Sequence, residues 1–307
     1  MSIPSLPVSS SVYASISLNW TDKLRLHQFP APITRSIADQ LRASWPPGIQ
    51  AEQVYARDSY EYKLKGTPFG AFGAQEEVGS RRLVRDVLAF LYARGWTLVT
   101  PLSHSRHARS KDSLIFKQRR QTDGGKGMGP AGGDVVPPPA VEWLVVAPTG
   151  GDRLRVISDG PVRRDVVAGR SGSGGIGGNG TTASLAKERN HDELGVLVQS
   201  IKQVMLGLDY FQSGEWSHDS FEFKLKGYPW SAMGEKTVKV ERLLLGIVET
   251  LDRFGWRSYA TVRQRSDSDD VRKQDTWYFV RDEGWVPGSP FNGKSSSVEA
   301  GADLAWQ

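Results

Sequence analysis

Two of the five histidines, His104 and His107, have a spacing that suits metal binding on a helix. They lie in a Ser- and Arg-rich loop with no third type of ligand nearby, and the matching loop in the second half of the chain has no histidine. The carboxylates that follow His191 would suit acid–base chemistry, but they stand at an expected helix start, where acidic residues stabilise the N-terminus. We therefore predict no metal site and no cofactor.

The glycine-rich run 124–129 resembles a phosphate-binding loop only in composition. It lacks the Gly-Lys-Ser/Thr ending, no hydrophobic strand leads directly into it, and no helix follows. Two pairs of aspartates recur at strand starts, Asp58 with Asp219 and Asp112 with Asp275, and turn or edge capping is the usual role of such residues. The sequence thus predicts no catalytic residue. An enzyme with an unrecognised site between the two halves stays an alternative.

The strongest candidates for binding are cations that recur in both halves of the chain. Strand alternation puts Lys63 and Lys65 on the opposite face from Tyr60 and Tyr62. If these cations share one open sheet face, that face suits nucleic acid or acidic lipid. The alternative is that Lys and Arg only solvate an exposed sheet and blunt its edges. The cationic set comprises Lys63, Lys65, Lys224, Lys226, Arg25 and Arg155.

The lysines of this set belong to the clearest internal repeat. Residues 58–66 read DSYEYKLKG and residues 219–227 read DSFEFKLKG, and both differences replace Tyr by Phe. Each copy continues with an x-Pro-aromatic step that ends in Phe69 or Trp230, which we expect to plug the core. A helix then ends in Gly-Trp, with Gly95 and Gly255 where a C-cap glycine belongs. The sequence therefore predicts one folded unit written twice.

Each unit is expected to have the order ββαβαββ in an α+β fold, with an antiparallel sheet and two helices on one face. The first helix of the second copy is expected from about His191 to Leu208, with Asn190 as its N-cap. Its second helix is expected to bury Leu244, Val248 and Leu251. The two units could pack sheet against sheet or share one continuous sheet, and the sequence does not separate these arrangements.

Composition shifts predict the domain boundaries. We expect a flexible N-terminus at residues 1–11, the first unit at 12–121 and a Gly/Pro-rich linker at 122–141. The second unit follows at 142–283, and a loose tail at 284–307. Within the second unit, residues 163–190 form a flexible Gly/Ser-rich insert.

The overall composition is that of packed domains. Hydrophobic residues make up 38% and charged residues 24%. The net charge of +5 permits an anionic partner, but it lacks the concentration of charge seen in a dedicated nucleic-acid binder. The absence of cysteine excludes disulfides, thiolate metal sites and cysteine nucleophiles. The first residues have no secretory signal and no apolar run is long enough to span a bilayer, which predicts an intracellular, cytoplasmic or nuclear protein.

The combined motifs resemble a group of uncharacterised, mainly fungal, tandem-repeat proteins. The resemblance rests on the DRLR-type hairpin, the E-x-K-L-K-G-x-P-aromatic strand, the helix ending in Gly-Trp and the D-T-W-Y-F strand. It implies an intracellular setting and no known activity. Our leading hypothesis is a non-enzymatic interaction or scaffold protein with a protein partner. An anion-binding module for nucleic acid or acidic lipid is the alternative.

Overall fold

The computed structural model describes residues 12–70, 73–102, 112–119, 135–158, 182–264 and 275–286. The His104/His107 pair, the glycine run 124–129, the first eleven residues and most of the tail lie outside these ranges. The predictions made for those segments therefore stay predictions. Among the residues described, no helix has the length and apolarity needed to cross a membrane.

The first unit alternates hairpins with helices. Its elements are β1 (Tyr13–Asn19), β2 (Lys23–His27), α1 (Ala31–Ser44), β3 (Ile49–Ala56), β4 (Ser59–Leu64), the short 3-10 helix η1 (Pro68–Gly70), α2 (Ala74–Ala93), β5 (Trp96–Leu102) and β6 (Ser113–Gln118).

The second unit repeats this order. Its elements are β7 (Val141–Thr149), β8 (Arg153–Ser158), α3 (Thr182–Gly207), β9 (Phe211–Ser217), β10 (Ser220–Leu225), η3 (Pro229–Ser231), α4 (Lys236–Arg253), β11 (Arg257–Val262) and β12 (Thr276–Asp282).

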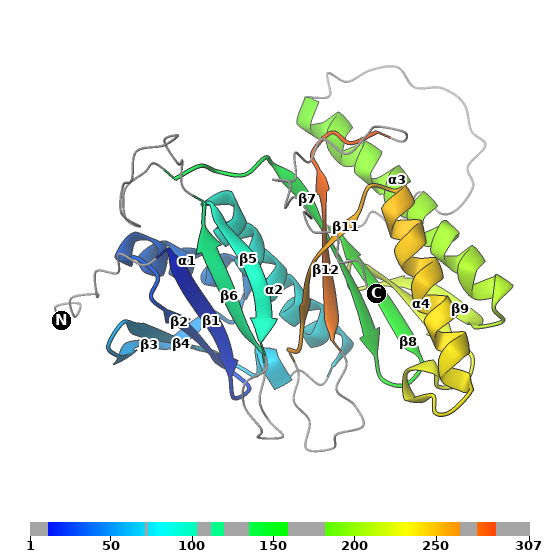
Figure 1. Ribbon diagram of the computed structural model, residues 1–307, viewed down its shortest axis with the longest axis horizontal. Helices are drawn as coiled ribbons and strands as arrows, with labels where there is room; N and C mark the ends of the chain where they lie inside the picture. Colours follow the sequence, from blue (N-terminus) through cyan, green and yellow to red (C-terminus); the bar gives the residue numbers. More distant parts are fainter. Residues whose placement is uncertain are drawn as a thin grey trace, which may run out of the picture.

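Both sheets are antiparallel and have the same strand order, which confirms a duplicated α+β unit (Figure 1). The order is β3-β4-β2-β1-β6-β5 in the first and β9-β10-β8-β7-β12-β11 in the second. Each unit has one strand more than the expected ββαβαββ order, because β3 and β9 precede the repeated DS(Y/F)E(Y/F)KLKG strand. These are edge strands whose residues are nearly all exposed, so they lack the alternation that identifies a half-buried strand.

The helices of each unit cover one face of its sheet, as predicted. In the first unit Ile37 and Leu41 of α1 and Leu83 and Leu91 of α2 are fully buried against the sheet. Tyr62 of β4 lies in the same core and donates a hydrogen bond from its hydroxyl to the carbonyl of Thr34. Burial of these apolar faces is what holds the helices on the sheet.

The buried face of α4 includes the predicted Leu251, but Leu243 and Ile247 take the places expected for Leu244 and Val248. Leu243, Ile247 and Leu251 are fully buried, matching Leu83, Val87 and Leu91 of α2. Val248, which was expected inside, is half exposed. The prediction failed because α4 is apolar on more than one side, and a shift of one residue turns a helix by 100°.

Helix α3 begins at Thr182, nine residues before the predicted start at His191. Asn190 therefore lies inside the helix and does not cap it. The added segment contains Ala, Leu, Lys, Glu and Arg, which are strong helix formers, whereas the prediction relied on a capping pattern alone. The last nine residues of the expected insert 163–190 thus belong to α3.

The predicted C-cap glycines are confirmed by their backbone conformation. Gly95 has φ +78° and Gly255 has φ +76°, a region that favours glycine. In each unit the chain that follows the last strand packs over this glycine. A Cβ would lie 2.7 Å from Val135 at Gly95, and 2.5 Å from Trp285 at Gly255. Val135 in the later part of the linker and Trp285 at the start of the tail are therefore held on their units.

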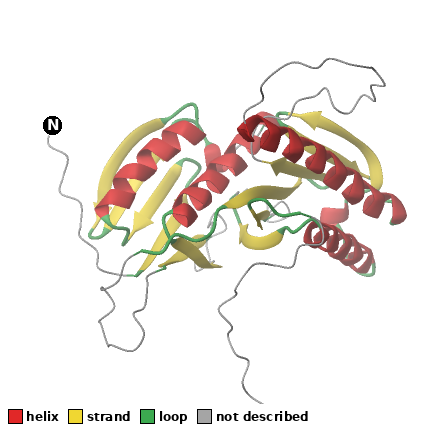
Figure 2. Ribbon diagram, turned by 90° about the horizontal axis from the view of Figure 1, so that it is seen from above, coloured by secondary structure: helices red, strands yellow, loops and turns green. Residues whose placement is uncertain are grey.

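The two units stack as alternating layers, with α2 between the two sheets (Figures 1 and 2). Trp143, Val145 and Tyr278, on the outer face of the second sheet, join the core of the first unit. The units thus pack helix against sheet, which is neither of the two arrangements left open by the sequence. As a result β7 at the centre of the second sheet is buried on both faces, while α3 and α4 form the last layer.

Candidate docking site on the second unit

The structure divides the cationic set between two sheets in different settings. Arg25 and Arg155 are equivalent, because each stands directly across from a glutamate, Glu61 or Glu222. Arg25 lies on the outer face of the first sheet and is half-buried, whereas the side chain of Arg155 is only 3% exposed at the contact between units. The set therefore does not form one continuous surface.

Carboxylates pair with much of the cationic set. Arg25 Nε lies 2.5 Å from Glu61 Oε2, and Arg155 pairs with Glu222. The set's lysines also have acidic neighbours: Lys63 is 3.8 Å from Asp22, and Lys226 is 2.5 Å from Asp209. Lys65 is exposed and Lys224 is half-buried. These pairings offset part of the positive charge, and anion binding by the set stays a prediction.

Two opposing effects set the pKa of Glu61, the glutamate that pairs with Arg25. Burial raises the pKa of the Glu61 carboxyl, but hydrogen bonds and charge from Arg25 and Lys23 outweigh burial and hold this pKa below its usual range. The Lys23 ammonium lies 3.0 Å from Glu61 Oε1, and the Arg25 guanidinium stacks 3.7 Å from the ring centre of Tyr55. The carboxylate therefore organises the cations around it.

Arginines of α2 hold the two units together. Arg82 donates to the carbonyl of Asp219 at 2.7 Å, and Arg85 donates to the carbonyl of Ser158 at 2.9 Å. Burial lowers the pKa of the Arg81 guanidinium, and the backbone carbonyl of Arg81 accepts a hydrogen bond from the Tyr278 hydroxyl of the second sheet at 3.4 Å. These contacts fix the register of α2 on the second sheet.

The same interface closes one end of the first unit. The carboxylate of Asp112 accepts the backbone N–H of Arg263 at 2.8 Å, and the carbonyl of Ser80 accepts the Gln264 side-chain amide at 3.4 Å. Asp112 was expected to cap a local turn, but its partner lies 151 residues away in the second unit. Arg263 and Gln264 thus act as a cover over the end of the first unit.

At the matching end of the second unit there is an open pocket. Its volume is about 360 Å³, and among the described residues its lining combines aromatic, proline and acidic side chains with no lysine or arginine. The indole N–H of Trp230 donates to the carbonyl of Arg153 at 2.7 Å, which holds this ring in place. The pocket is lined by Pro148, Pro229, Trp230, Ala232, Thr237, Val240, Glu241, Asp275 and Trp277.

The pocket and the closed end of the first unit are built from equivalent positions. Strand register matches Trp277 with Leu114 and Asp275 with Asp112. Leu114 is fully buried, whereas Trp277 is half-buried. The repeated Pro-aromatic step differs in the same way: Phe69 is buried as expected of a core plug, but Trp230 is half-buried at the pocket. Sequence reasoning noted Trp230 and Asp275 without connecting them.

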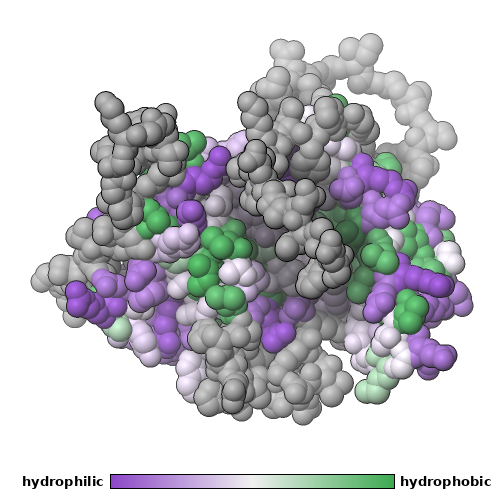
Figure 3. Space-filling model, viewed as in Figure 1, coloured by the Kyte–Doolittle hydropathy of each residue, from purple (hydrophilic) through white to green (hydrophobic). Residues whose placement is uncertain are grey.

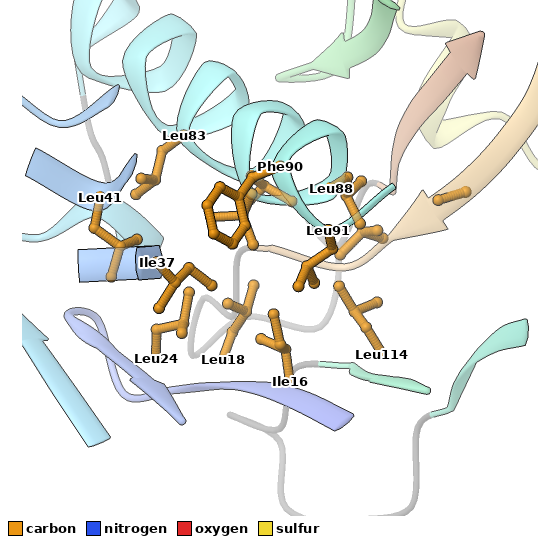
Figure 4. Close-up of a cluster of buried hydrophobic side chains, with 14 of the residues drawn as sticks. Ile16, Leu18, Leu24, Ile37, Leu41, Leu83, Leu88, Phe90, Leu91 and Leu114 are labelled. Atoms are coloured by element: carbon orange, nitrogen blue, oxygen red, sulfur yellow. The ribbon is translucent and has the colours of Figure 1, made fainter. Parts of the chain in front are cut away.

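Beside the pocket, α4 exposes apolar side chains that the corresponding face of α2 buries. Leu245 is 69% and Val248 49% exposed, and hydrophobic side chains stand among hydrophilic ones on this part of the surface (Figure 3). Their counterparts on α2 are Arg85 and Leu88, both buried. Leu88 is fully buried in the cluster that the two units share (Figure 4). The docking face is defined here as Leu245 and Val248 of α4 together with the pocket.

Three further findings bear on identity. Among the described residues, no group of three or more His, Asp or Glu side chains is placed to hold a metal ion. A family model for a domain of unknown function matches residues 12–117 and 189–280, more than half of the chain and one segment in each unit. Comparisons with curated proteins and with solved structures find no match.

Proposed function

The chain belongs to this protein family of unknown function, and we propose from its geometry that it is a non-enzymatic interaction protein. The second unit docks a partner protein on the docking face. The first unit and the layered contact between units form the rigid base of that surface. The intracellular setting implied by the sequence is part of the same proposal.

One observation carries the proposal. The helix layer and the closed end of the first unit are covered by the second unit, through α2, Asp112 and Ser80. The equivalent positions on the second unit keep the apolar side chains Leu245 and Val248 exposed and leave the pocket open. The contact between the two units therefore shows that a folded protein unit can cover a surface of this kind.

Apolar exposure on this face also has an energetic consequence. Exposed apolar side chains grouped on a surface mark sites where association removes them from water. The buried Leu88 of α2 corresponds to Val248 of α4, which is exposed. A partner that covered Val248 would remove its apolar surface from water.

The test is capture of partners with matched variants of the full chain. Tagged wild type, Leu245→Glu/Val248→Glu and Ser15→Glu/Ser17→Glu would be incubated with an extract of the cells that express the protein. Ser15 and Ser17 are half-buried on the outer face of the first sheet, away from α4. We expect proteins bound by wild type and by the serine variant to be lost from the α4 variant. Melting curves would verify that all three proteins are folded.

Two results would contradict the proposal. In one, the α4 variant retains every protein that the wild type captures. In the other, captured proteins are lost only from the serine variant, which would move the binding surface to the first sheet.

Anion binding is the second proposal, and its best support lies on the first sheet. Lys23, Arg25 and Lys63 stand together on that sheet's outer face, beside the ring of Tyr55. Fluorescence anisotropy with single-stranded RNA and duplex DNA, and sedimentation with anionic vesicles, would compare wild type with Lys63→Glu/Lys65→Glu/Lys224→Glu/Lys226→Glu. Binding that persists at near-physiological salt and is lost in the variant supports it. Equal, salt-sensitive binding by both proteins contradicts it.

A further inference from the structure

We infer that the pocket of the second unit binds an arginine side chain carried by an extended segment of the partner protein. This inference rests on the proposed function and adds the chemistry that the docking face recognises. Three independent features of the described residues support it: the charge of the lining, a second arginine site in the same unit, and the cover over the first unit.

The lining of the pocket favours a cation. Glu241 and Asp275 contribute two carboxylates to the described lining; Asp275 pairs with Arg263 at 3.3 Å, and no ion pair is seen for Glu241 among the described residues. Trp230 and Trp277 add two indole rings, whose faces attract cations. A guanidinium can stack on an indole and bind a carboxylate through its edge at the same time, which an ammonium group does less well. An anionic ligand would meet the like charge of Glu241.

The second unit already holds one arginine with the same combination of groups. The Arg281 guanidinium lies 4.5 Å from the ring centre of Trp256 and 5.4 Å from that of Trp285. Its nitrogen atoms lie 2.5 Å from Glu142 and 2.9 Å from Glu193. Two tryptophans and two carboxylates therefore suffice, in this fold, to bury an arginine. The described lining of the pocket offers two tryptophans and two carboxylates as well, of which Asp275 already pairs with Arg263 at its edge.

The cover over the first unit shows what kind of segment reaches this position. There Arg263 and Gln264 approach as an irregular segment after β11. The backbone N–H of Arg263 donates to Asp112, and the side-chain amide of Gln264 donates to the carbonyl of Ser80. The pocket has Asp275 and Val240 at those two positions. Asp275 also binds a guanidinium at its edge, because Arg263 Nε lies 3.3 Å away. By analogy with Asp112, a partner segment can reach Asp275 through a backbone N–H, which leaves Glu241 as the acceptor for its guanidinium.

One substitution between the units makes the pocket selective. Glu241 stands where the first unit has Arg81, so the charge at this position is reversed. An arginine in a partner segment would be repelled at the first position and attracted at the second. Glu241→Arg restores the first unit's residue and is the natural variant with which to test the inference.

The experiment measures binding of short peptides to the full chain. The probe is a fluorescent peptide with the chain's own sequence from Tyr259 to Gln264, YATVRQ, compared with versions in which its arginine is replaced by lysine, alanine or glutamate. The proteins are wild type, Glu241→Gln, Glu241→Arg and, as a matched control at an exposed helix site, Glu249→Gln. Anisotropy gives the affinities. The indole N–H signal of Trp277, assigned with Trp277→Phe, reports the site by NMR.

We expect the arginine peptide to bind wild type and to shift the Trp277 signal. Removal of one carboxylate in Glu241→Gln should weaken binding about tenfold, the usual worth of a hydrogen bond to a charged group. Glu241→Arg should abolish binding, Glu249→Gln should leave it unchanged, and the lysine peptide should bind more weakly than the arginine peptide. The alanine and glutamate peptides should not bind.

The inference is overturned if no arginine peptide binds at millimolar concentration, if the alanine peptide binds equally well, or if Glu241→Arg has no effect. Its failure can be told apart from failure of the proposed function. Partner capture that is lost in Leu245→Glu/Val248→Glu but retained in Glu241→Arg keeps the docking face and removes the arginine pocket. Analytical ultracentrifugation adds a further result: self-association lost in Leu245→Glu/Val248→Glu would make the occupant a second copy, contradicting a separate partner.

Discussion

The two units share one frame, yet their outward faces differ according to what covers them. Pairs of equivalent positions on the outer sheet faces show this most directly. Tyr13 and Ser15 of the first sheet correspond to Trp143 and Val145 of the second. The first pair is partly exposed, whereas the second pair is buried against α2. The two units thus have similar residues on the inner faces of their sheets, and they differ on the outer face where the second unit contacts the first.

The helix layers show the opposite trend. On α2 the outward residues are buried by the second sheet, whereas on α4 the equivalent residues are exposed and remain apolar in part. An exposed face normally becomes polar, as the first sheet did at Ser15 and Ser17. The apolar residues of α4 are therefore the part of the comparison on which the proposed partner binding rests.

The largest effect is expected at the centre of the contact between units. Trp143→Ala removes a buried indole that also contacts the ring of Tyr92, with ring centres 6.0 Å apart. We expect the free energy of unfolding to fall by about 3–5 kcal/mol. Its equivalent, Tyr13→Ala, should cost less than about 1 kcal/mol because this ring is half exposed. Urea denaturation measures both, and equal costs would contradict the layered packing.

A matched pair of helix variants sharpens the same comparison. Leu88→Ala leaves a cavity in the shared cluster and should cost about 2–4 kcal/mol. Val248→Ala, at the equivalent position of α4, should change the free energy of unfolding by less than about 0.5 kcal/mol in the free protein. A large cost for Val248→Ala would mean that the α4 face is already covered. Urea denaturation at several protein concentrations would detect this, including covering by a second copy.

A smaller effect is expected where strands β5 and β11 of the two units meet. The hydroxyl of Tyr259 accepts the backbone N–H of Leu98 at 3.0 Å. Tyr259→Phe removes this acceptor and should lower the free energy of unfolding by about 1 kcal/mol. At the equivalent bulge position in the first unit stands the exposed Val99, and Val99→Ala should have almost no effect. Amide exchange at Leu98 should become faster in Tyr259→Phe, and unchanged exchange would contradict the contact.

The smallest effect concerns pH and the outer face of the first sheet. The folded pKa of Glu61 lies below its usual value of 4.5, so Glu61 stabilises the fold above that value. This contribution is lost as the pH falls through the folded pKa. The difference in free energy of unfolding between wild type and Glu61→Gln should therefore shrink below about pH 4.5. Denaturation at several pH values measures it, and a difference that grows on acidification would reverse the predicted sign.

Much of the fold was predictable because it depends on short-range patterns. The repeated strand, the C-cap glycines and the inward-facing Tyr62 follow from alternation and from the conformational freedom of glycine. The edge strands β3 and β9 were missed because strands exposed on both sides carry no such pattern. The docking face was missed for another reason. Trp230 and Asp275 can be recognised as parts of a pocket only by comparison with Phe69 and Asp112, whose end of the first unit is covered by the second unit.

The sequence by itself determined that one unit occurs twice, which residues of the repeated strand face each core, and that both copies keep the same cations and aspartates. These properties are encoded within a few residues of each position. Only the tertiary structure decided that α2 lies between two sheets, that Arg155 is buried while Arg25 is partly exposed, and that the pocket is open on one unit alone. Those outcomes depend on which surfaces meet across the units. A repeated sequence describes both copies alike, and it is the packing of one copy on the other that makes them different.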